Sequence, residues 1–249
     1  MIIAVSDVHL GFSKSNKADF IRFLDWIATQ PYVTDFVLAG DILDFWRRDM
    51  VAVTMENADV MARLIAMYKS GMNIYYIAGN HDYTVRHLKI FPNRFKFSTK
   101  VELVEDGVEY TFVHGHEFDP DQNTVFFDPL CYTNDQSGRF ADRVWDVYSK
   151  YVNPLKYPLE WIRQWISKRT IDEMVKPPEE RGYVSTFAPD TLVSVTMEGV
   201  VTVSGHTHAP GIYRDTNSVN TGSWVQNPDC VFNTYVVIDG DEIHLRRFS

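Results

Sequence analysis

Histidine and carboxylate residues follow directly after the apolar stretches of this chain, in short turns that also contain glycine. The stretches that end at Val5 and Ala39 lead to Asp7-Val8-His9 and Gly40-Asp41-Ile42-Leu43-Asp44. Later stretches lead to Gly79-Asn80-His81-Asp82, His114-Gly115-His116 and Gly205-His206-Thr207-His208. Imidazole and carboxylate groups together suit intermediate divalent metals such as zinc, manganese, iron or nickel. The pattern therefore predicts a metal centre assembled from several turns.

The distribution of histidine supports this interpretation. Of the eight histidines, all but His87 and His244 occur in these turns, and we expect those two to be structural. Each block alone has an ordinary interpretation, since Gly79-Asn80 is a common turn pair and Asp7 is a frequent turn residue. The set lacks cysteine, which disfavours a structural zinc site. The conjunction of the blocks is what indicates a metal centre.

The elements that must position these turns alternate at the start of the chain. Apolar runs predict strands at Ile2–Val5, Phe36–Ala39 and Ile74–Ala78, and helical periodicity predicts helices at Asn16–Thr29 and Val53–Ser70. The order β-α-β-α-β implies a parallel sheet with crossover helices. Such sheets bind ligands beyond the carboxyl ends of their strands, so we expect the turns to meet in one crevice.

Further strands are expected later in the chain. They are Val101–Val104, Glu109–Val113, Val200–Ser204, Gly211–Tyr213, Ser218–Thr221, Thr234–Ile238 and Glu242–Arg247. Asp106-Gly107 is a hairpin signal between the first two. The predicted fold is α/β, with two packed mixed sheets flanked by helices in a four-layer α/β/β/α sandwich. One domain is expected over residues 1–249, with a helical cap insertion at about 120–188 that is rich in tryptophan.

The blocks, taken together and in this order, resemble the calcineurin-like metallophosphoesterase superfamily. The resemblance implies two divalent ions, with manganese the first choice and iron, zinc or nickel as alternatives. It implies that a water or hydroxide bridging the two ions is the nucleophile. It assigns Asp41 to both ions, and the other ligands to one ion each: Asp7, His9 and His208 to the first, Asn80, His114 and His206 to the second.

The same resemblance gives two further residues a catalytic role. His81 is similar to the general acid of the family, which protonates the leaving oxygen. Asp44 is similar to the carboxylate that orients this histidine in the protein-phosphatase branch. Asp82 and His116 are candidates for supporting the ligands or for touching substrate.

Within the superfamily, the chain looks most like the UDP-diacylglucosamine hydrolase branch. The similarity rests on Asp44-Phe45-Trp46, on the His-Gly-His-Glu-Phe-Asp stretch from His114, and on the aromatic insertion. The Arg-Gly that follows this block in Ser/Thr protein phosphatases is absent, which argues against a phosphoprotein substrate. Members of the branch carry arginine at the position of His81 and His-Gly-Asp in place of His-Gly-His. We therefore expect an enzyme that hydrolyses a phosphodiester or pyrophosphate bond of a small substrate, nucleotide-linked compounds among them.

Two alternative functions are a nuclease and a metal-binding scaffold. The Asp-Val-His-Leu-Gly opening also resembles the nuclease subunit of double-strand-break repair complexes, which would imply a manganese-dependent nuclease. The net charge of −9 argues against a nucleic-acid partner. A metal-binding scaffold without catalysis is the second alternative, and the presence of His81 argues against it. A homodimer is a further expectation.

Bulk features bear on the compartment and on local charge. Two cysteines provide no disulfide framework, and the sequence has neither a secretory signal pattern nor an apolar run long enough to span a bilayer. These features predict a cytoplasmic protein. The segment 84–100 contains basic and no acidic residues. It is either a phosphate-facing surface or an ordinary solvated face, and residues 139–169 carry a similar excess of basic residues.

Overall fold

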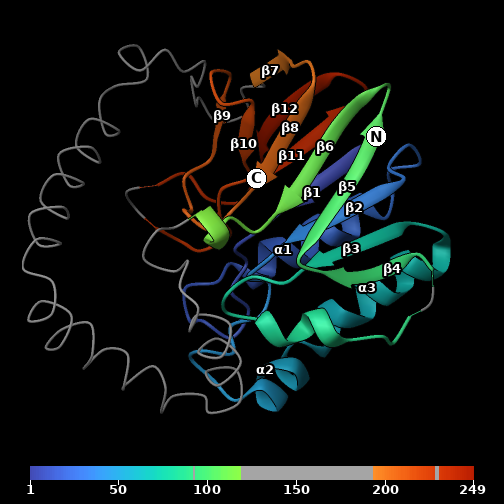
Figure 1. The fold of residues 1–249 in the computed structure, drawn as a ribbon. Helices are drawn as coiled ribbons and strands as arrows, with labels where there is room; N and C mark the ends of the chain where they lie inside the picture. The colour runs from blue at the N-terminus through green and yellow to red at the C-terminus, as the bar shows by residue number, and fades with distance from the viewer. Residues whose placement is uncertain (92, 119–192, 228–229) are drawn as a thin grey trace, which may run out of the picture.

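The computed structural model describes residues 1–91, 93–118, 193–227 and 230–249. Within these ranges the chain forms two β-sheets that pack face to face, with α-helices against one of them (Figure 1). The predicted helical cap insertion lies outside the described residues. No helix of the described residues is long and apolar enough to cross a membrane.

The larger sheet has seven strands in the order β4-β3-β2-β1-β11-β12-β7. Strands β1 to β4 run parallel to one another, which the β-α-β-α-β order predicts for the first three. Strand β11 pairs antiparallel with β1, and β12 and β7 also add in antiparallel fashion. The strands are β1 (Ile2–Val5), β2 (Asp35–Ala39), β3 (Asn73–Ile77), β4 (Phe95–Ser98), β7 (Val193–Thr196), β11 (Thr234–Asp239) and β12 (Glu242–Arg247).

The smaller sheet has five strands in the order β5-β6-β8-β10-β9. It is also mixed, because β8 is parallel to both β6 and β10 while the outer pairs are antiparallel. The β5–β6 turn places Asp106 at φ 47° and Gly107 at φ 86°, in the left-handed conformation that the hairpin signal predicts. The strands are β5 (Lys100–Glu105), β6 (Val108–Val113), β8 (Val200–Ser204), β9 (Gly211–Tyr213) and β10 (Ser218–Asn220).

Three α-helices cover the outer face of the seven-stranded sheet: α1 (Lys17–Ile27), α2 (Met50–Glu56) and α3 (Ala58–Ser70). Two apolar cores result, one between these helices and the sheet and one between the two sheets. The prediction of an α/β fold with two mixed sheets and flanking helices is confirmed. Short 3-10 helices, η1 (Tyr83–His87) and η2 (His116–Phe118), follow two of the metal-type turns.

The prediction of one helix over Val53–Ser70 is wrong, because the structure has two helices separated at Asn57. The Asn57 side chain is buried and donates from Nδ2 to the carbonyl of Val53 at 2.7 Å. An asparagine that bonds to nearby backbone competes with the helix and favours its end. Strands β4 and β7 were not predicted.

The core beneath α1 is built around Phe23. Its ring centroid lies 4.9 Å from those of both Trp224 and Tyr235, and the side chain is fully buried. These partners come from the far end of the sequence, so this contact ties α1 to the last strands of the sheet.

We expect Phe23→Ala to lower the free energy of unfolding by about 3–5 kcal/mol, because it removes transfer energy and leaves a cavity. Urea unfolding measures this loss. Tyr32→Ala is the matched control, since Tyr32 is 77% exposed and its removal costs little. Equal urea midpoints for the Phe23→Ala and Tyr32→Ala proteins would contradict the conclusion that Phe23 stabilises the core.

Candidate metal centre

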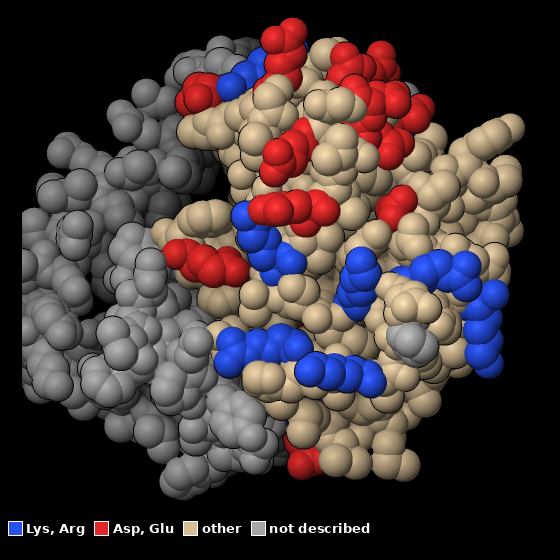
Figure 2. Space-filling view, turned by 45° about the vertical axis from the view of Figure 1, so that its right-hand side comes forward, with Lys and Arg blue, Asp and Glu red and all other residues tan. Residues whose placement is uncertain are grey.

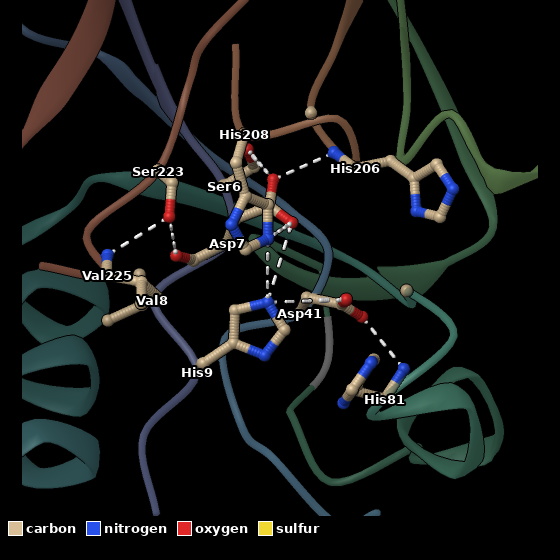
Figure 3. A network of polar contacts seen from close by, with 12 residues as sticks. Ser6, Asp7, Val8, His9, Asp41, His81, His206, His208, Ser223 and Val225 are labelled. Atoms are coloured by element: carbon tan, nitrogen blue, oxygen red, sulfur yellow. Dashed lines mark hydrogen bonds and ion pairs between the residues drawn. The ribbon is translucent and has the colours of Figure 1, made fainter. Parts of the chain in front are cut away.

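The metal-type turns meet at one edge of the two sheets. Asp7 and His9 follow β1, Asp41 follows β2, and Asn80 and His81 follow β3. The parallel strands β6 and β8 of the other sheet end in the turns that carry His114, His206 and His208. Residues far apart in the chain thus surround one point (Figure 3). The crevice expected at the strand ends is present.

The residues predicted for the first metal are in contact. Asp7 Oδ1 lies 3.2 Å from His208 Nε2, and His9 Nε2 lies 3.1 Å from the same atom. The side chains of Asp7, His9 and His208 each offer a ligand atom, and these atoms all lie within 4.8 Å of one another. Asp7 and His9 are buried, whereas His208 is partly exposed, so this cluster opens to solvent on the His208 side.

Asp41 connects this cluster to the second one. Its Oδ2 lies 3.7 Å from His9 Nε2 and 3.3 Å from His114 Nε2. His114 Nε2 also lies 3.1 Å from Asn80 Oδ1. The other nitrogen of His114, Nδ1, donates to the carbonyl of Ala39 at 2.9 Å, which leaves Nε2 free to face the cluster as a ligand. The Asp41 carboxylate thus lies between the His9 and His114 rings, and its assignment to both ions stays a prediction.

His206 lies at the edge of the second cluster. Its ring centroid is 5.2 Å from that of His114, and its backbone N–H donates to Asp7 Oδ2 at 2.8 Å. The residue therefore anchors Asp7 through its main chain and approaches the second cluster with its ring.

The donor atoms fit divalent cations. Asp7 Oδ1 is buried and has no hydrogen-bond partner among the described residues, although ring nitrogens of His9 and His208 lie near it. Buried polar atoms in folded proteins normally have partners, so an oxygen left without one marks a place for a further group. Clustered imidazole, carboxylate and amide donors make that group a metal ion.

Five of the residues in these turns have a left-handed backbone. The φ angles of Asp7, His9, Asp41, His206 and His208 lie between 50° and 67°. This region is uncommon for residues other than glycine, and such residues gather at functional sites. The turns with metal-type side chains thus contain five of the nine non-glycine residues with positive φ in the described part of the chain.

Glycines in the same turns allow the close approach. A Cβ on Gly79 would lie 2.1 Å from Asp41 Oδ1, and one on Gly205 would lie 2.3 Å from Asp7 Oδ2. Both distances are far below van der Waals contact, so a side chain at either position would displace a ligand.

Asp82 ties two of the turns together. Its buried carboxylate accepts hydrogen bonds from the backbone N–H groups of Ile42 at 2.9 Å and Gly79 at 2.7 Å, and from the Tyr76 hydroxyl at 2.7 Å. Burial and the nearby charge of Asp41 raise the pKa of Asp82. These contacts make Asp82 a support for the turns that carry Asp41 and Asn80.

Asp44 links a ligand to the predicted acid. Its buried carboxylate lies 3.3 Å from His9 Nδ1 and 3.1 Å from His81 Nδ1. Burial opposes the charge of Asp44, but the hydrogen bonds with His81 and His9 hold its pKa well below the usual range. His81 also lies in a group with His9 and Asp41 whose ligand atoms are within 4.8 Å of one another.

His116 is close to the second cluster and buried. Its ring centroid lies 5.5 Å from that of His114 and 6.4 Å from that of His206. Burial lowers its pKa to about 4, so it is neutral at pH 7. The histidines expected to be structural lie elsewhere: His87 is in η1, and His244 in β12 is 3.5 Å from Glu242.

Sequence reasoning missed several residues that shape the centre. The Ser6 hydroxyl donates to Asp7 Oδ2 and lies 2.6 Å from Thr221 Oγ1. These contacts hold the Asp7 carboxylate in its orientation. The Trp46 ring stacks on that of His81 with centroids 4.4 Å apart. Arg47 pairs with Asp44. Trp46 was noted only as part of the Asp44-Phe45-Trp46 signature, without a role. For Ser6 and Arg47 the one signal available was that they adjoin the blocks in the chain.

The basic segment 84–100 does not line the metal centre. Its lysines at 89, 96 and 100 border a separate groove with β4 and β5, and this side of the molecule comes forward in Figure 2. Basic side chains extend across that face below a group of acidic ones. Lys96 lies over the Tyr75 ring and Lys100 pairs with Glu102, which favours a solvated face over a phosphate-facing one. The segment 139–169 lies outside the described residues.

Two mixed sheets with a cluster of buried carboxylates and imidazoles at their strand ends define an α/β protein with a metal-binding centre. The model of the family described as calcineurin-like phosphoesterase matches residues 1–210. The chain therefore belongs to this family of metal-dependent phosphoric ester hydrolases. The resemblance noted in the sequence is confirmed.

Relatives agree with the expected branch. The chain is 26% identical over 220 residues to a UDP-2,3-diacylglucosamine hydrolase from Aliivibrio fischeri, covering 84% of this chain and 82% of that protein. It is 23% identical to a UDP-2,3-diacylglucosamine hydrolase from Azotobacter vinelandii, and the match covers 99% of this chain and 98% of that protein. A dimetal phosphatase from Danio rerio aligns in structure with a TM-score of 0.49 at 12% identity, over 98% of this chain and 94% of that one.

Two histidines of the cluster carry protons that a metal ion would have to displace. Burial disfavours the charged form of His9, but hydrogen bonds with Asp44 and Asp7 and the charge of Asp41 outweigh it and raise its pKa to about 10. Burial likewise opposes the charge of His114, and Asp41 chiefly raises its pKa to about 10. Both imidazoles are therefore protonated at pH 7 without metal.

We expect the affinity for Mn²⁺ to rise with pH between 6 and 9, by about tenfold per pH unit for each proton displaced. The sign follows because a cation binds neutral imidazole, and both pKa values lie above this range. Titration calorimetry in buffers of different ionisation enthalpy measures the protons released. His244→Gln is the control and should release as many as the unmodified protein. Affinity independent of pH, with no proton released, would refute this coupling.

Proposed function

We propose that the chain is a dinuclear metal-dependent phosphoesterase that hydrolyses a phosphodiester or pyrophosphate bond in a small, nucleotide-linked substrate. The observation that carries the proposal is Asp41, whose carboxylate lies between the His9 and His114 nitrogens at the meeting point of two ligand clusters. A shared carboxylate between two sets of donors is the arrangement that two-metal hydrolysis requires.

Each cation has three ligands of its own in this proposal, and the two cations share Asp41. Asp7, His9, Asp41 and His208 hold the first, and Asp41, Asn80, His114 and His206 hold the second. When bound, two divalent cations activate a water for attack and neutralise the phosphoryl oxygens. Manganese is our first choice because the donors are nitrogen and oxygen without sulfur. We further propose a cytoplasmic location, in keeping with the low cysteine content.

His81 protonates the leaving oxygen in this proposal. Its ring is partly exposed at the mouth of the metal pocket, where a substrate would enter. Asp44 accepts from its Nδ1, which directs Nε2 outward, and Trp46 stacks on the ring and restricts its rotation. His116, neutral and close to His114 and His206, is placed to contact a bound phosphoryl group.

The bond class is supported by the relatives, whose names describe hydrolysis of a UDP-linked compound. We carry over the nucleotide-linked phosphoryl bond and leave the acyl part of those substrates aside, because the two relatives are only 26% and 23% identical to this chain. The test is therefore designed around the bond that is broken.

The experiment is hydrolysis by metal-stripped protein refilled separately with Mn²⁺, Zn²⁺, Ni²⁺ and Mg²⁺. We expect turnover of bis-p-nitrophenyl phosphate and of a UDP-sugar with Mn²⁺, and little with p-nitrophenyl phosphate. Asp41→Asn should lower kcat by at least about 1000-fold, since it weakens both cation sites. No turnover with any metal would overturn the proposal, and cleavage of DNA alone would support a nuclease.

Asp44 is expected to act through His81 and His9. Asp44→Asn should lower kcat by about 10- to 100-fold with KM little changed, because an amide does not hold the imidazoles in the same tautomer. Steady-state kinetics with bis-p-nitrophenyl phosphate measure this. Asp49→Asn is the matched control, as Asp49 caps α2 away from the pocket. A variant as active as the control would remove Asp44 from the catalytic assignment.

A further inference from the structure

The metal pocket adjoins a second, larger cavity. The metal pocket has a volume of about 200 Å³, and its lining includes His9, Asp41 and His81. The second cavity has a volume of about 530 Å³ and is bordered by the start of α1 and the residues around α2. Phe12 and Arg47 line both, so these two side chains form the boundary between them. A substrate larger than one phosphoryl group has room to extend past this boundary.

Three basic side chains line the second cavity: Lys17, Arg47 and Arg48. Among the described lining residues, Glu56 is the one with an acidic side chain. Each of the three cations pairs with a carboxylate, so binding of an anionic ligand here depends on donors that such a pair leaves unused.

Arg47 is held in place at the boundary. One guanidinium nitrogen, Nη1, pairs with the buried Asp44 carboxylate, and the backbone N–H of Arg47 donates to the same carboxylate at 3.2 Å. On its other side the guanidinium lies over the Phe12 ring, with Cζ 4.4 Å from the ring centroid. Two anchors on a long side chain reduce the entropy that a ligand would have to remove.

Arg47 keeps donors available despite these anchors. A guanidinium has five N–H groups in a planar fork. Within the described part of the chain, Asp44 is the hydrogen-bond partner of its side chain, through Nη1 alone. The side chain is 40% exposed, and it faces both cavities. The other donors can therefore bind an anion without breaking the pair with Asp44.

The other two basic side chains of the second cavity, Lys17 and Arg48, are paired. Lys17 Nζ lies 2.8 Å from Asp59 Oδ1 and 2.8 Å from the carbonyl of Glu56, and Arg48 pairs with the Glu56 carboxylate. Arg47 is thus the cation that combines nearness to the metal pocket with unused donors.

We propose that Arg47 binds a second phosphoryl group of the substrate, adjacent to the one that reacts, and that the second cavity receives the group attached to it. The ligand class is a diphosphate diester, such as a nucleoside diphosphate conjugate. Arginine suits this role because its fork binds two phosphate oxygens at once. The inference rests on the proposed function and refines its substrate.

The test compares a substrate with two phosphoryl groups and a substrate with one, and it follows how the ratio of their rates changes between variants. They are UDP-glucose, a diphosphate diester, and the p-nitrophenyl ester of thymidine 5′-monophosphate, a monophosphate diester. The ratio of their kcat/KM values is measured for the manganese-loaded protein, for Arg47→Gln and for Arg47→Lys. Arg63→Gln is the matched control, because Arg63 pairs with Asp25 and lines neither cavity.

We expect Arg47→Gln to lower kcat/KM for UDP-glucose about 10- to 100-fold more than for the monophosphate diester, the worth of one or two charged hydrogen bonds. The loss should appear mainly in KM. Arg47→Lys should recover part of it, and Arg63→Gln should leave the ratio unchanged. The lysine variant also keeps a cation beside Asp44, so it tests the inference even if the glutamine variant folds poorly.

The contrary outcomes separate this inference from the proposed function. An equal loss for both substrates in both Arg47 variants would mean that Arg47 acts through Asp44 alone, which overturns the inference and leaves the function standing. The inference is also overturned, with the function left standing, if the unmodified protein cleaves the monophosphate diester but not UDP-glucose. Unmodified protein that cleaves neither substrate with any of the four metals would overturn both.

Discussion

The rest of this structure depends on how it keeps several carboxylates buried at the ends of its strands. Asp7, Asp41, Asp44 and Asp82 are all nearly inaccessible to solvent. A buried carboxylate without partners costs several kcal/mol, so each needs compensation. The imidazoles of His9 and His114 compensate Asp7 and Asp41. Asp44 pairs with His81 and Arg47. Asp82 accepts hydrogen bonds from two backbone N–H groups and from the Tyr76 hydroxyl. In the function that we propose, divalent cations replace the protons of His9 and His114.

Assembling such a cluster requires backbone geometry that the chain adopts only under constraint. Left-handed conformations at Asp7, Asp41 and His208 cost about 1–3 kcal/mol each and persist where the surroundings over-determine them. The two apolar cores supply that constraint, because each ligand turn begins at the end of a strand buried in them. Asp82 adds a local restraint by accepting hydrogen bonds from two of the turns. The rigid sheets therefore stabilise a site that would be unstable by itself.

Asp44 connects the three parts of the proposed chemistry. Its carboxylate contacts the ligand His9, the proposed acid His81 and the boundary residue Arg47. Metal coordination, proton transfer and recognition of a second phosphoryl group would thus share one anchor. A carboxylate suits position 44, because it accepts on both oxygens and so serves all three partners.

The sequence by itself determined most strand positions, the parallel order of the first strands and the turns whose histidine and carboxylate side chains meet in one cluster. These are local properties: apolar runs mark buried strands, and glycine beside histidine and aspartate marks the turns at their ends. Only the tertiary structure decided the break at Asn57 and the pairing of Ser6 with Thr221, which are 215 residues apart. It likewise placed Trp46 on His81 and Arg47 between two cavities. The physical reason is that such contacts depend on how the sheets bring distant turns together, and a side chain beside a motif carries no mark of the partner it will meet.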